Sequence, residues 1–367
     1  MRVAITGPNG FLGQHLRFAL FPLSSEFETL LLDRHVLEEG GAKLLDPLKK
    51  CDALVHLAGM NRGEDNEIYL TNVGLAEQVV NACDRVNTKP TIIFSSSTQI
   101  AKSNIYGKSK KKAMEIFRTW GRRNGAIVTN LVIPNIFGEF GRPFYNSAVA
   151  TFCHQIVRGE NSEVNPTAVV TLVYAQEVAK LILELLREPR NQDIPVPGRE
   201  IKIAEVYDTL VSFKKDYFNN VVPEMNDSFE CALFNTFRSH LPNDFYPRYL
   251  DPKRDVRGAL FEVVKERTGG HTFFSFTKPG FTRGEHYHTR KFERFCVIQG
   301  KAEIKLRKLL SNEVNSFIVE GSRPSFIDIP TFYTHNITNI GDTDLLTLFW
   351  ANEIFNPADP DTYPEKV

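Results

Sequence analysis

The sequence predicts two domains: an α/β domain with a doubly wound parallel sheet, followed by an all-β sandwich or barrel. The chain has 367 residues, more than a single domain of about 150 residues requires. Its first half alternates short β-branched runs with segments of helix-like apolar spacing, which is typical of βαβ units. From Leu260 onward, short β-type runs follow one another between Gly, Pro and Asn or Asp turns. We therefore expect a boundary near residue 245, with domains over residues 1–244 and 245–367.

The expected elements follow in order along the chain. Apolar runs predict strands of the parallel sheet over residues 3–6, 30–32, 53–58, 91–95 and 127–133. A helix is expected over residues 175–188, because Pro189 cannot continue it. Residues 189–247 have a helical and loop-like pattern punctuated by prolines. Runs of the second domain predict strands over residues 271–277, 295–298, 302–306 and 345–350.

The composition excludes several classes of partner. Lys and Arg together number 44, as do Asp and Glu, so the net charge is zero. This balance provides no basic surface, and we expect neither nucleic acid nor a membrane surface as a partner. No stretch approaches about 18 apolar residues, and the apolar run after Met1 is too short for a signal peptide. The five cysteines form no C-x-x-C pair, so we expect a reducing compartment, the cytoplasm.

A glycine-rich loop directly follows the first expected strand. It runs from Gly7 through Gly10 to Gly13 and opens a helix. Glycines at this spacing permit a tight turn and a close approach of the backbone to a pyrophosphate, which then lies at the positive helix N-terminus. The loop therefore predicts dinucleotide binding, with a plain βα turn as the alternative. Asp33 and Arg34 end the second expected strand; the acid favours the ribose hydroxyls of NAD, whereas the arginine favours the 2′-phosphate of NADP.

A serine run and a Tyr/Lys pair supply candidate reaction chemistry. Ser97 closes the run at the end of the strand that begins at residue 91, on the rim where α/β sheets bind ligands. Tyr106 and Lys110 lie one helical turn apart on one face. The ammonium of Lys110 is therefore expected to stabilise the phenolate of Tyr106 and to lower its pKa from about 10. Ser95 and Ser96 belong to the same run, so the register of the active serine stays open.

Three further motifs accompany this set: His56 to Gly59, Asn72-Val73 and Pro134-Asn135. Together these features resemble an extended short-chain dehydrogenase/reductase of the nucleotide-sugar type, with a Rossmann-type fold. By this resemblance Ser97, Tyr106 and Lys110 are catalytic. The dinucleotide-binding residues that it implies are Gly7, Asn9, Gly10, Phe11, Leu12, Gly13, Asp33, Arg34, Leu57, Ala58, Gly59, Tyr106 and Lys110.

Four ligand-type residues stand in the all-β half. His286 and His288 are two residues apart on an expected strand, so they point to one face. Glu293, at the start of the next run, and His335, from a distant hairpin, complete a ligand set suited to Zn, Fe(II), Mn or Ni, and zinc is the expected metal. These segments resemble the two motifs of a jelly-roll cupin domain. The glycine that usually follows the proline of the second motif is replaced by Phe332, so we expect a bulkier rim there with His335 still in register.

The same strand has a rival interpretation. Arg283-Gly284-Glu285-His286 resembles the R-G-x-H segment of deoxysugar 3,5-epimerases, metal-free cupins whose histidine removes a proton beside a ketone. A second stretch, Asp255-x-Arg257-Gly258 followed by Phe261-Glu262, resembles the opening of that family. His286 is therefore either a catalytic base or a metal ligand.

A reductase joined to an epimerase-like cupin resembles the CapF family of bifunctional capsular polysaccharide synthesis enzymes and its lipopolysaccharide counterparts. The resemblance spans nearly the whole chain, including Tyr145-Asn146-Ser147 and Pro360-Asp361-Thr362-Tyr363. It implies that the cupin epimerises C3 of a UDP-linked 2-acetamido-2,6-dideoxy-4-hexulose and that the reductase domain then reduces the C4 ketone with NADPH. The implied product is UDP-N-acetyl-6-deoxy-L-talosamine, a precursor of UDP-N-acetyl-L-fucosamine for capsule or O-antigen. A homodimer is the expected assembly.

Three alternatives stay open from the sequence. In the first, the cupin metal is structural and only the reductase is active. In the second, the chain is a dinucleotide-sensing protein without turnover. In the third, the cupin is an Fe(II) dioxygenase. A sensor has no need of the set Ser97, Tyr106 and Lys110, and a dioxygenase gives no reason for the fused reductase.

Overall fold

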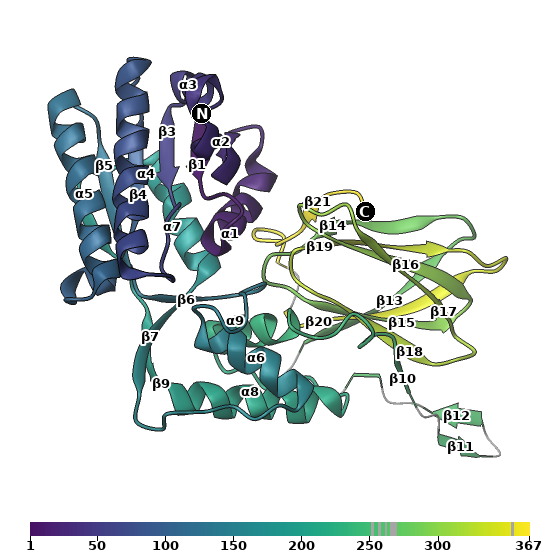
Figure 1. The fold of residues 1–367 in the computed structure, drawn as a ribbon. Coiled ribbons are helices and arrows are strands. Elements are labelled where there is room, and N and C mark those ends of the chain that lie inside the picture. Colours follow the sequence, from purple (N-terminus) through teal and green to yellow (C-terminus); the bar gives the residue numbers. More distant parts are fainter. Residues whose placement is uncertain (251–252, 256–257, 261–262, 265–269, 354–355) are drawn as a thin grey trace. The chain divides into compact units, whose positions relative to one another are not determined.

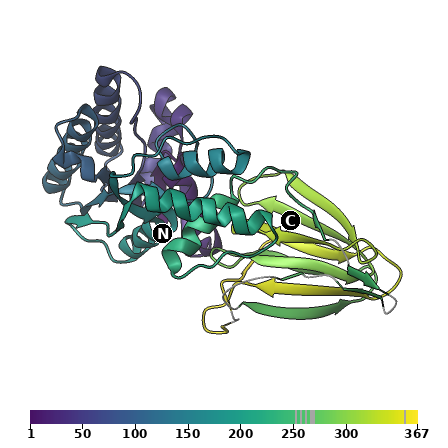
Figure 2. The ribbon, with the colours of Figure 1, turned by 90° about the horizontal axis from the view of Figure 1, so that it is seen from below.

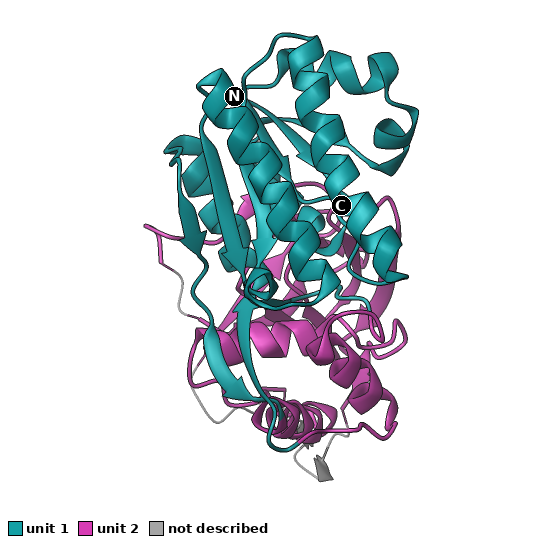
Figure 3. Cartoon of the chain, turned by 60° about the vertical axis from the view of Figure 1, so that its left-hand side comes forward, with its two compact units in different colours: residues 1–142, 166–203 teal, residues 143–165, 204–367 magenta. Residues whose placement is uncertain are grey.

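The structure, a computed structural model, describes residues 1–250, 253–255, 258–260, 263–264, 270–353 and 356–367. The chain divides into two compact units (Figure 3). Unit 1 comprises residues 1–142 and 166–203, and unit 2 comprises residues 143–165 and 204–367. The segments 143–165 and 204–244 therefore cluster with the all-β part of the chain. The functional boundary that we expect near residue 245 is a different division of the same chain.

Unit 1 contains a six-stranded sheet in which every neighbouring pair of strands is parallel (Figure 1). The strand order is β2-β1-β3-β4-β5-β8, so the direction of winding reverses between β1 and β3. In open α/β sheets this switch point is where ligands bind. The predicted doubly wound sheet is confirmed. The bounds are β1 (Arg2–Thr6), β2 (Glu28–Leu32), β3 (Ala53–His56), β4 (Thr91–Ser97), β5 (Val128–Ile133) and β8 (Asp193–Pro195).

Helices cover both faces of this sheet because alternate strand residues point in opposite directions. Ala4 packs into a core with α4 and α5, whereas Val3 and Ile5 pack into another core with α1 and α7. Within the described residues, no helix is both long and apolar enough to cross a membrane. The helices are α1 (Phe11–Leu20), α2 (Arg34–Glu39), α3 (Gly41–Lys50), α4 (Asp65–Arg85), α5 (Ile105–Asn124) and α7 (Ala175–Arg187), with 3-10 turns η1 (Phe21–Leu23) and η2 (Thr98–Ala101).

A second, smaller sheet in unit 1 has the order β6-β7-β9. Its strands are β6 (Asn135–Phe137), β7 (Val169–Tyr174) and β9 (Arg199–Lys202). The expectation of only helix and loop after Pro189 is wrong for β8 and β9. These strands have three and four residues, too few for an alternating pattern to register in the sequence.

Unit 2 contains two five-stranded antiparallel sheets, with the orders β10-β18-β15-β20-β13 and β17-β16-β19-β14-β21 (Figures 1 and 2). Residues from both sheets form one apolar core, which confirms the predicted all-β sandwich. A separate hairpin joins β11 (Lys253–Asp255) and β12 (Gly258–Leu260). The other strands are β10 (Arg248–Tyr249), β13 (His271–Thr277), β14 (Thr282–Tyr287), β15 (Glu293–Gln299), β16 (Lys301–Lys308), β17 (Val314–Glu320), β18 (Ser325–Ile329), β19 (Tyr333–Asn339), β20 (Leu345–Ala351) and β21 (Tyr363–Pro364).

Three helices belong to unit 2 with the sandwich: α6 (Ala148–Arg158), α8 (Ile203–Phe218), which begins one residue before the unit, and α9 (Ser228–Arg238). Helix α9 begins after Asp227, whose carboxylate accepts a hydrogen bond from the amide of Glu230. Phe234 of α9 packs edge-on against Phe292, which precedes β15, with 5.5 Å between the ring centres. The helices therefore share buried apolar contacts with the sandwich.

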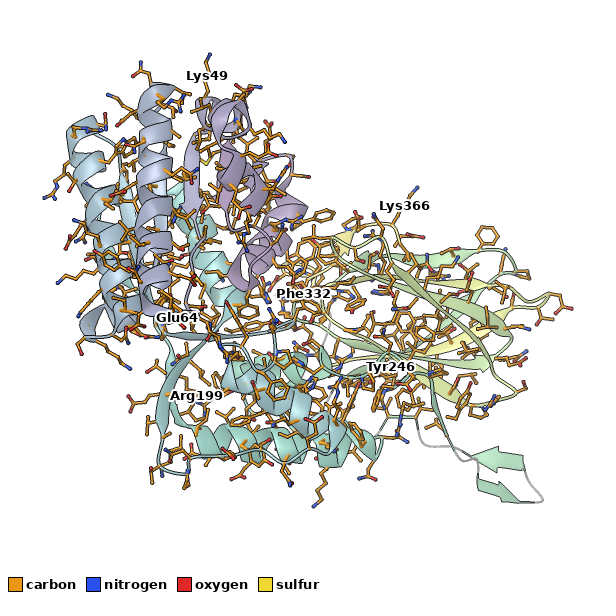
Figure 4. The ribbon with its side chains drawn as sticks, viewed as in Figure 1. Lys49, Glu64, Arg199, Tyr246, Phe332 and Lys366 are labelled. Carbon is orange, nitrogen blue, oxygen red and sulfur yellow. The ribbon has the colours of Figure 1, made fainter. Side chains whose placement is uncertain are left out.

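A buried ionic cluster reinforces this packing. Arg294 of β15 donates to Asp328 of β18 through Nε at 2.7 Å and a terminal nitrogen at 3.0 Å. The hydroxyl of Tyr217, from α8, also donates to Asp328, and it lies 2.5 Å from the hydroxyl of Tyr246, labelled in Figure 4. Arg294 and Asp328 are each 1% exposed. Such a pair holds its geometry because neither charge can be left alone in the interior.

Candidate active sites

The glycine loop between β1 and α1 is shaped by contacts that no side chain permits. Gly7 has a φ of +66°, and a Cβ there would lie 2.8 Å from the backbone nitrogen of Ala58. A Cβ on Gly13 would lie 2.2 Å from the carbonyl oxygen of Gly7. The glycines therefore let the loop approach the end of β3 closely at the switch point of the sheet.

The first turn of α1 fits an anionic ligand. No side chain caps this helix after Gly10, so no side chain meets the amides of its first turn, which begins at Phe11. Thr6 links the two loops of the site, because its hydroxyl accepts hydrogen bonds of 3.1 Å from the amides of Leu57 and Ala58. These features fit the pyrophosphate of a dinucleotide.

Two other loop residues have partners within the protein. The side-chain oxygen of Asn9 accepts a hydrogen bond of 3.1 Å from Arg17. Leu12 is half-buried and packs against the core beneath the sheet. Their side chains therefore support the loop, leaving its backbone as the part available to a phosphate.

Asp33 and Arg34 differ sharply in what they contact. Asp33 caps α2, since its carboxylate accepts a hydrogen bond of 3.0 Å from the amide of Val36. Arg34 is 91% exposed and pairs with Glu38, one turn along α2, at 2.6 Å. This ion pair raises the pKa of Arg34. The guanidinium is therefore the group of the two that is free to rotate toward a 2′-phosphate.

Ser97 ends β4, whereas Tyr106 and Lys110 lie in the first two turns of α5. The ammonium of Lys110 donates to the carbonyl oxygen of Ser95 at 2.9 Å and lies 5.9 Å from the centre of the Tyr106 ring. Ser95 donates from its hydroxyl to the carbonyl oxygen of His56, and Ser96 is buried. Ser97 is half-buried at the end of β4, and its oxygen accepts from the amide of Gln99. Among the three serines, the geometry favours Ser97 as the one open to a substrate.

Burial shifts the pKa values of Tyr106 and Lys110 in opposite directions. It raises the pKa of Tyr106 to about 12 and lowers the pKa of Lys110 to about 8. The expectation that the pKa of Tyr106 is lowered is therefore wrong, since burial raises it. The physical reason is that both groups are desolvated and that the Lys110 ammonium is directed to the Ser95 carbonyl.

Asn72, from the Asn72-Val73 motif, is a supporting residue of this site. It is buried, and it donates to the carbonyl oxygen of Met60 at 2.8 Å and to the hydroxyl of Ser109 at 2.9 Å. It thereby ties the loop after β3 to α5. A Cβ on Gly59, in that loop, would lie 3.3 Å from the Lys110 nitrogen. The sequence provided the motif, whereas the hydrogen-bond partners that satisfy this buried amide follow from the fold.

The second site lies in the sandwich of unit 2. The ligand atoms of His286, His288, Glu293 and His335 all lie within 4.8 Å of one another. Nε2 of His288 and Nε2 of His335 are each 3.3 Å from the same carboxylate oxygen of Glu293. The structure thus brings together all four residues that the sequence predicted.

A bulge in β14 brings the histidines into register. Gly284 pairs with Asn336 of β19, whereas His286 pairs with His335, and Glu285 between them has a φ of +58°. Gly284 itself has a φ of +101°, and a Cβ there would lie 2.7 Å from the carbonyl oxygen of His335. The extra residue re-aims the strand so that His286 faces His335 directly.

The donor set fits a divalent metal. Nε2 of His288 and Nε2 of His335 are buried, and among the described residues the polar group near each is the Glu293 carboxylate at 3.3 Å. Nδ1 of His288 lies 2.5 Å from the carbonyl oxygen of Asp361 and Nδ1 of His335 lies 3.3 Å from that of Tyr333. Since each Nδ1 faces a carbonyl, each Nε2 is the nitrogen left to bind a metal. Three imidazoles and one carboxylate are ligands that zinc accepts.

Electrostatics at this site keep one group neutral and another charged. Burial lowers the pKa of His286 to about 4, and the neighbouring histidines add to this shift. Burial acts to raise the pKa of Glu293, but His288 and His335 outweigh it and hold that pKa well below its usual range. A neutral imidazole beside a carboxylate suits either a metal ligand or a proton acceptor.

Phe332 corrects the expectation of a bulkier rim. Its φ is +61°, the left-handed conformation that glycine usually supplies, and its side chain is fully buried (labelled in Figure 4). The amide of Phe332 donates to the carbonyl oxygen of His288 at 2.8 Å. The turn of the motif is thus retained with a side chain pointing inward, and His335 keeps its register.

The rival epimerase segment is only partly described. The side chain of Arg283 donates to the hydroxyl of Thr277 and the carbonyl oxygen of Phe276, so it braces the turn before β14. Arg257, Phe261 and Glu262 lie outside the described residues.

Residues 3–204 match the NAD dependent epimerase/dehydratase family. The chain belongs to this family. Residues 253–363 match the Polysaccharide biosynthesis C-terminal domain. This pairing confirms the predicted resemblance to CapF. The crystal structure of the capsular polysaccharide assembling protein CapF from Staphylococcus aureus is 35% identical, with a TM-score of 0.66 and 100% of both chains covered.

Two other proteins are similar to the whole chain or to part of it. The UDP-2-acetamido-2,6-beta-L-arabino-hexul-4-ose reductase of Pseudomonas aeruginosa is 32% identical, over 99% of this chain and 98% of the relative. The UDP-N-acetylglucosamine 4-epimerase of Methanobrevibacter ruminantium is 18% identical with a TM-score of 0.55, over 65% of this chain and 97% of that one. The latter likeness shows the fold of the first two thirds alone.

Proposed function

We propose that this protein is a bifunctional nucleotide-sugar enzyme. Its cupin domain epimerises C3 of a UDP-linked 2-acetamido-2,6-dideoxy-4-hexulose, and its reductase domain then reduces the C4 ketone with NADPH. The product is UDP-N-acetyl-6-deoxy-L-talosamine, on the route to UDP-N-acetyl-L-fucosamine for capsule or O-antigen. The observation that carries the proposal is that one chain holds a Ser/Tyr/Lys set at the switch point of its sheet and a four-residue His/Glu cluster inside its sandwich.

The first site supports ketone reduction. Tyr106 stays protonated at neutral pH, since burial raises its pKa to about 12, so it is available as the acid that gives a proton to the C4 oxygen. Ser97 is half-buried at the adjoining strand end and holds that oxygen by its hydroxyl. Bound NADPH supplies the hydride to C4. The full-length similarity to a relative named as a UDP-hexulose reductase supports this assignment.

The second site supports proton transfer at C3. A proton on a carbon beside a ketone is acidic because the resulting anion spreads onto the oxygen. His286 is the most exposed member of the cluster and is neutral, so it is the member placed to take that proton. A divalent metal, zinc in this proposal, would supply Lewis-acid chemistry at this site when bound. His288, Glu293 and His335 are the buried residues that hold it.

The order of the two reactions follows from their chemistry. Epimerisation at C3 is reversible as long as the neighbouring ketone acidifies the C3 proton. Reduction at C4 removes that acidity and fixes the new configuration. The reductase therefore pulls the epimerisation forward, which explains why one chain carries both sites.

The assembly and location belong to the same proposal. We place the functional boundary near residue 245 and the enzyme in the cytoplasm, where its five free thiols stay reduced. A homodimer is supported by β13, an edge strand of its sheet on which Phe274 is 61% and Phe276 65% exposed. An edge strand with exposed aromatic side chains offers unpaired backbone groups and apolar surface to a second chain.

The decisive experiment follows deuterium at C3 by NMR while NADPH oxidation is measured in the same sample. His286→Ala is expected to stop C3 exchange in D2O and to leave reduction of a ketone already epimerised at C3 intact. Tyr106→Phe is expected to do the reverse, lowering reduction by roughly 10²- to 10⁴-fold while exchange and NADPH binding continue. Tyr69→Phe, a tyrosine of α4 with no place in either site, is the matched control.

Each half of the proposal fails separately. Exchange that survives in a folded His286→Ala protein would make a structural metal the better account of the cupin. Near-normal reduction by Tyr106→Phe would remove the tyrosine from the reaction. If His286→Ala retains its metal but loses exchange, His286 is the base; if the metal is lost as well, it is a ligand.

A further inference from the structure

Asp361 is the residue of the C-terminal tail that is held most firmly. It is 2% exposed, and its carboxylate accepts four hydrogen bonds from the turn after β14. The amide and hydroxyl of Thr289 donate to Oδ1 at 3.0 and 2.5 Å. The amides of Arg290 and Lys291 donate to Oδ2 at 2.9 and 2.8 Å. The backbone of Asp361 is thus fixed against that turn.

The carbonyl oxygen of the same residue reaches the metal-type cluster. It lies 2.5 Å from Nδ1 of His288, and a carbonyl can only accept, so Nδ1 carries the hydrogen. In a neutral imidazole the other nitrogen then has the lone pair, which places it on Nε2, 3.3 Å from Glu293. The four bonds to the carboxylate therefore decide which nitrogen of His288 faces the cluster.

We propose that Asp361 is a positioning residue of the cupin site, which holds His288 in the Nδ1-protonated tautomer and so prepares Nε2 to bind a divalent cation. The proposal deepens the proposed function and rests on its metal site. The carboxylate of Asp361 does not touch the cluster; it acts through the backbone carbonyl of the same residue, which contacts His288.

The rest of the tail is fastened independently, which allows a controlled test. Glu285 accepts a hydrogen bond from the amide of Val367, and Thr334 donates to the carbonyl oxygen of Glu365. The exposed carboxylate of Asp359 pairs with Arg290 at 3.0 Å and makes no contact with His288. Loss of the Asp361 carboxylate therefore leaves other attachments of the tail in place.

The test variant is Asp361→Asn in the full-length protein. Asn is among the residues that best tolerate the left-handed conformation of this position, whose φ is +43°. In either orientation, the amide NH2 of the asparagine faces two of the groups that now donate to Oδ1 or Oδ2. It cannot accept their hydrogen bonds. Zn²⁺ affinity, measured by competition with a chelator, is expected to fall roughly 10- to 100-fold, as is usual when the partner of a ligating histidine is lost. Asp359→Asn should leave the affinity unchanged.

A graded pair sharpens the result. Thr289→Val removes one of the four donors and should weaken Zn²⁺ less than Asp361→Asn does, whereas Thr289→Ser keeps the donor and should bind as the natural protein. Equal Zn²⁺ affinity in Asp361→Asn and the natural protein, both folded by circular dichroism, would overturn the proposal.

The tautomer is measured without metal or substrate, so the proposal can fail while the proposed function stands. Long-range ¹H–¹⁵N spectra of histidine-labelled, metal-free protein distinguish a protonated Nδ1 from a protonated Nε2. We expect His288, assigned by its absence in His288→Gln, to be Nδ1-protonated in the natural protein and to lose that state in Asp361→Asn. A His288 that is Nε2-protonated in the natural protein, or unchanged in the variant, would overturn the positioning role. Loss of C3 exchange alone would bear only on the proposed function.

Discussion

The ammonium of Lys110 lies 5.9 Å from the centre of the Tyr106 ring and donates to the carbonyl oxygen of Ser95. Both side chains are shielded from water, so each favours its uncharged form more than it would in solution. At neutral pH this leaves Tyr106 as a phenol and Lys110 still largely protonated. Tyr106 thus carries the proton, and the positive charge of Lys110 lies beside it.

The first prediction is a loss of reductase efficiency in mild alkali. Because burial lowers the pKa of Lys110 to about 8, its positive charge disappears as the pH rises through that value. We expect kcat/KM for reduction, which reports groups of the free enzyme, to decline above about pH 8. Lys108→Met, which alters an exposed lysine of the same helix, should keep this profile. A profile that stays flat to pH 10 would show that the Lys110 charge is not required.

The second prediction concerns coenzyme choice. Arg34→Ala should weaken NADPH by roughly 10- to 100-fold, the value of a hydrogen bond to a charged group, and NADH much less. Titration of both coenzymes by fluorescence measures this. Glu38→Gln frees the guanidinium without removing it and should not weaken NADPH. Equal weakening of both coenzymes by Arg34→Ala would point to Asp33 as the residue that reads the ribose.

The third prediction is a loss of stability in acid that depends on His56. Burial, and secondarily the Lys110 charge, lowers the pKa of His56 to about 3, whereas the unfolded chain binds the proton below about pH 6.5. The folded state therefore loses stability as the pH falls below about 6.5, the pKa of histidine in the unfolded chain. The loss is about 2 kcal/mol at pH 5.

His56→Asn should remove this part of the pH dependence. Urea unfolding at pH 7 and pH 5 measures it, with a change of the exposed His35 to Asn as the control. An undiminished difference between the two pH values in His56→Asn would assign the acid sensitivity to other groups.

The fourth prediction concerns the ionic cluster of unit 2. Asp328→Asn leaves the Arg294 guanidinium buried without a counter-charge and should cost about 3–5 kcal/mol of unfolding free energy. The double variant Arg294→Met with Asp328→Leu removes both charges and should be less destabilised than Asp328→Asn alone. Chemical denaturation of the three proteins tests this. A double variant that is destabilised as much as Asp328→Asn, or more, would contradict this coupling.

Much of the fold could be predicted because it depends on local patterns. The run over residues 271–277 coincides with β13, and the helix expected to end before Pro189 ends at Arg187. The four residues of the His/Glu cluster were also predictable from their types and spacing, although His288 follows β14 and a bulge in that strand sets the register of His286.

Other features depend on tertiary context that the sequence does not display. Nothing near Asp361 indicates that its carbonyl meets His288, 73 residues away. Burial reverses the shift expected for the Tyr106 pKa, because a helical spacing shows neighbours but not solvent. Phe332 occupies a left-handed position against its own preference, and only the packing of its buried ring can compensate for that.

The division of the chain into interleaved units has a consequence for its synthesis. Unit 1 is interrupted by residues 143–165 and is complete only once residue 203 has been made. During synthesis on the ribosome, unit 1 is therefore completed only after residues 143–165, which belong to unit 2, have been made. If the protein were divided at residue 244, Tyr217 and Phe234 would lie on one fragment. Their partners Asp328 and Phe292 would lie on the other. A division at residue 244 therefore separates buried partners within unit 2, and we do not expect a fragment that begins at residue 245 to keep the packing of that unit.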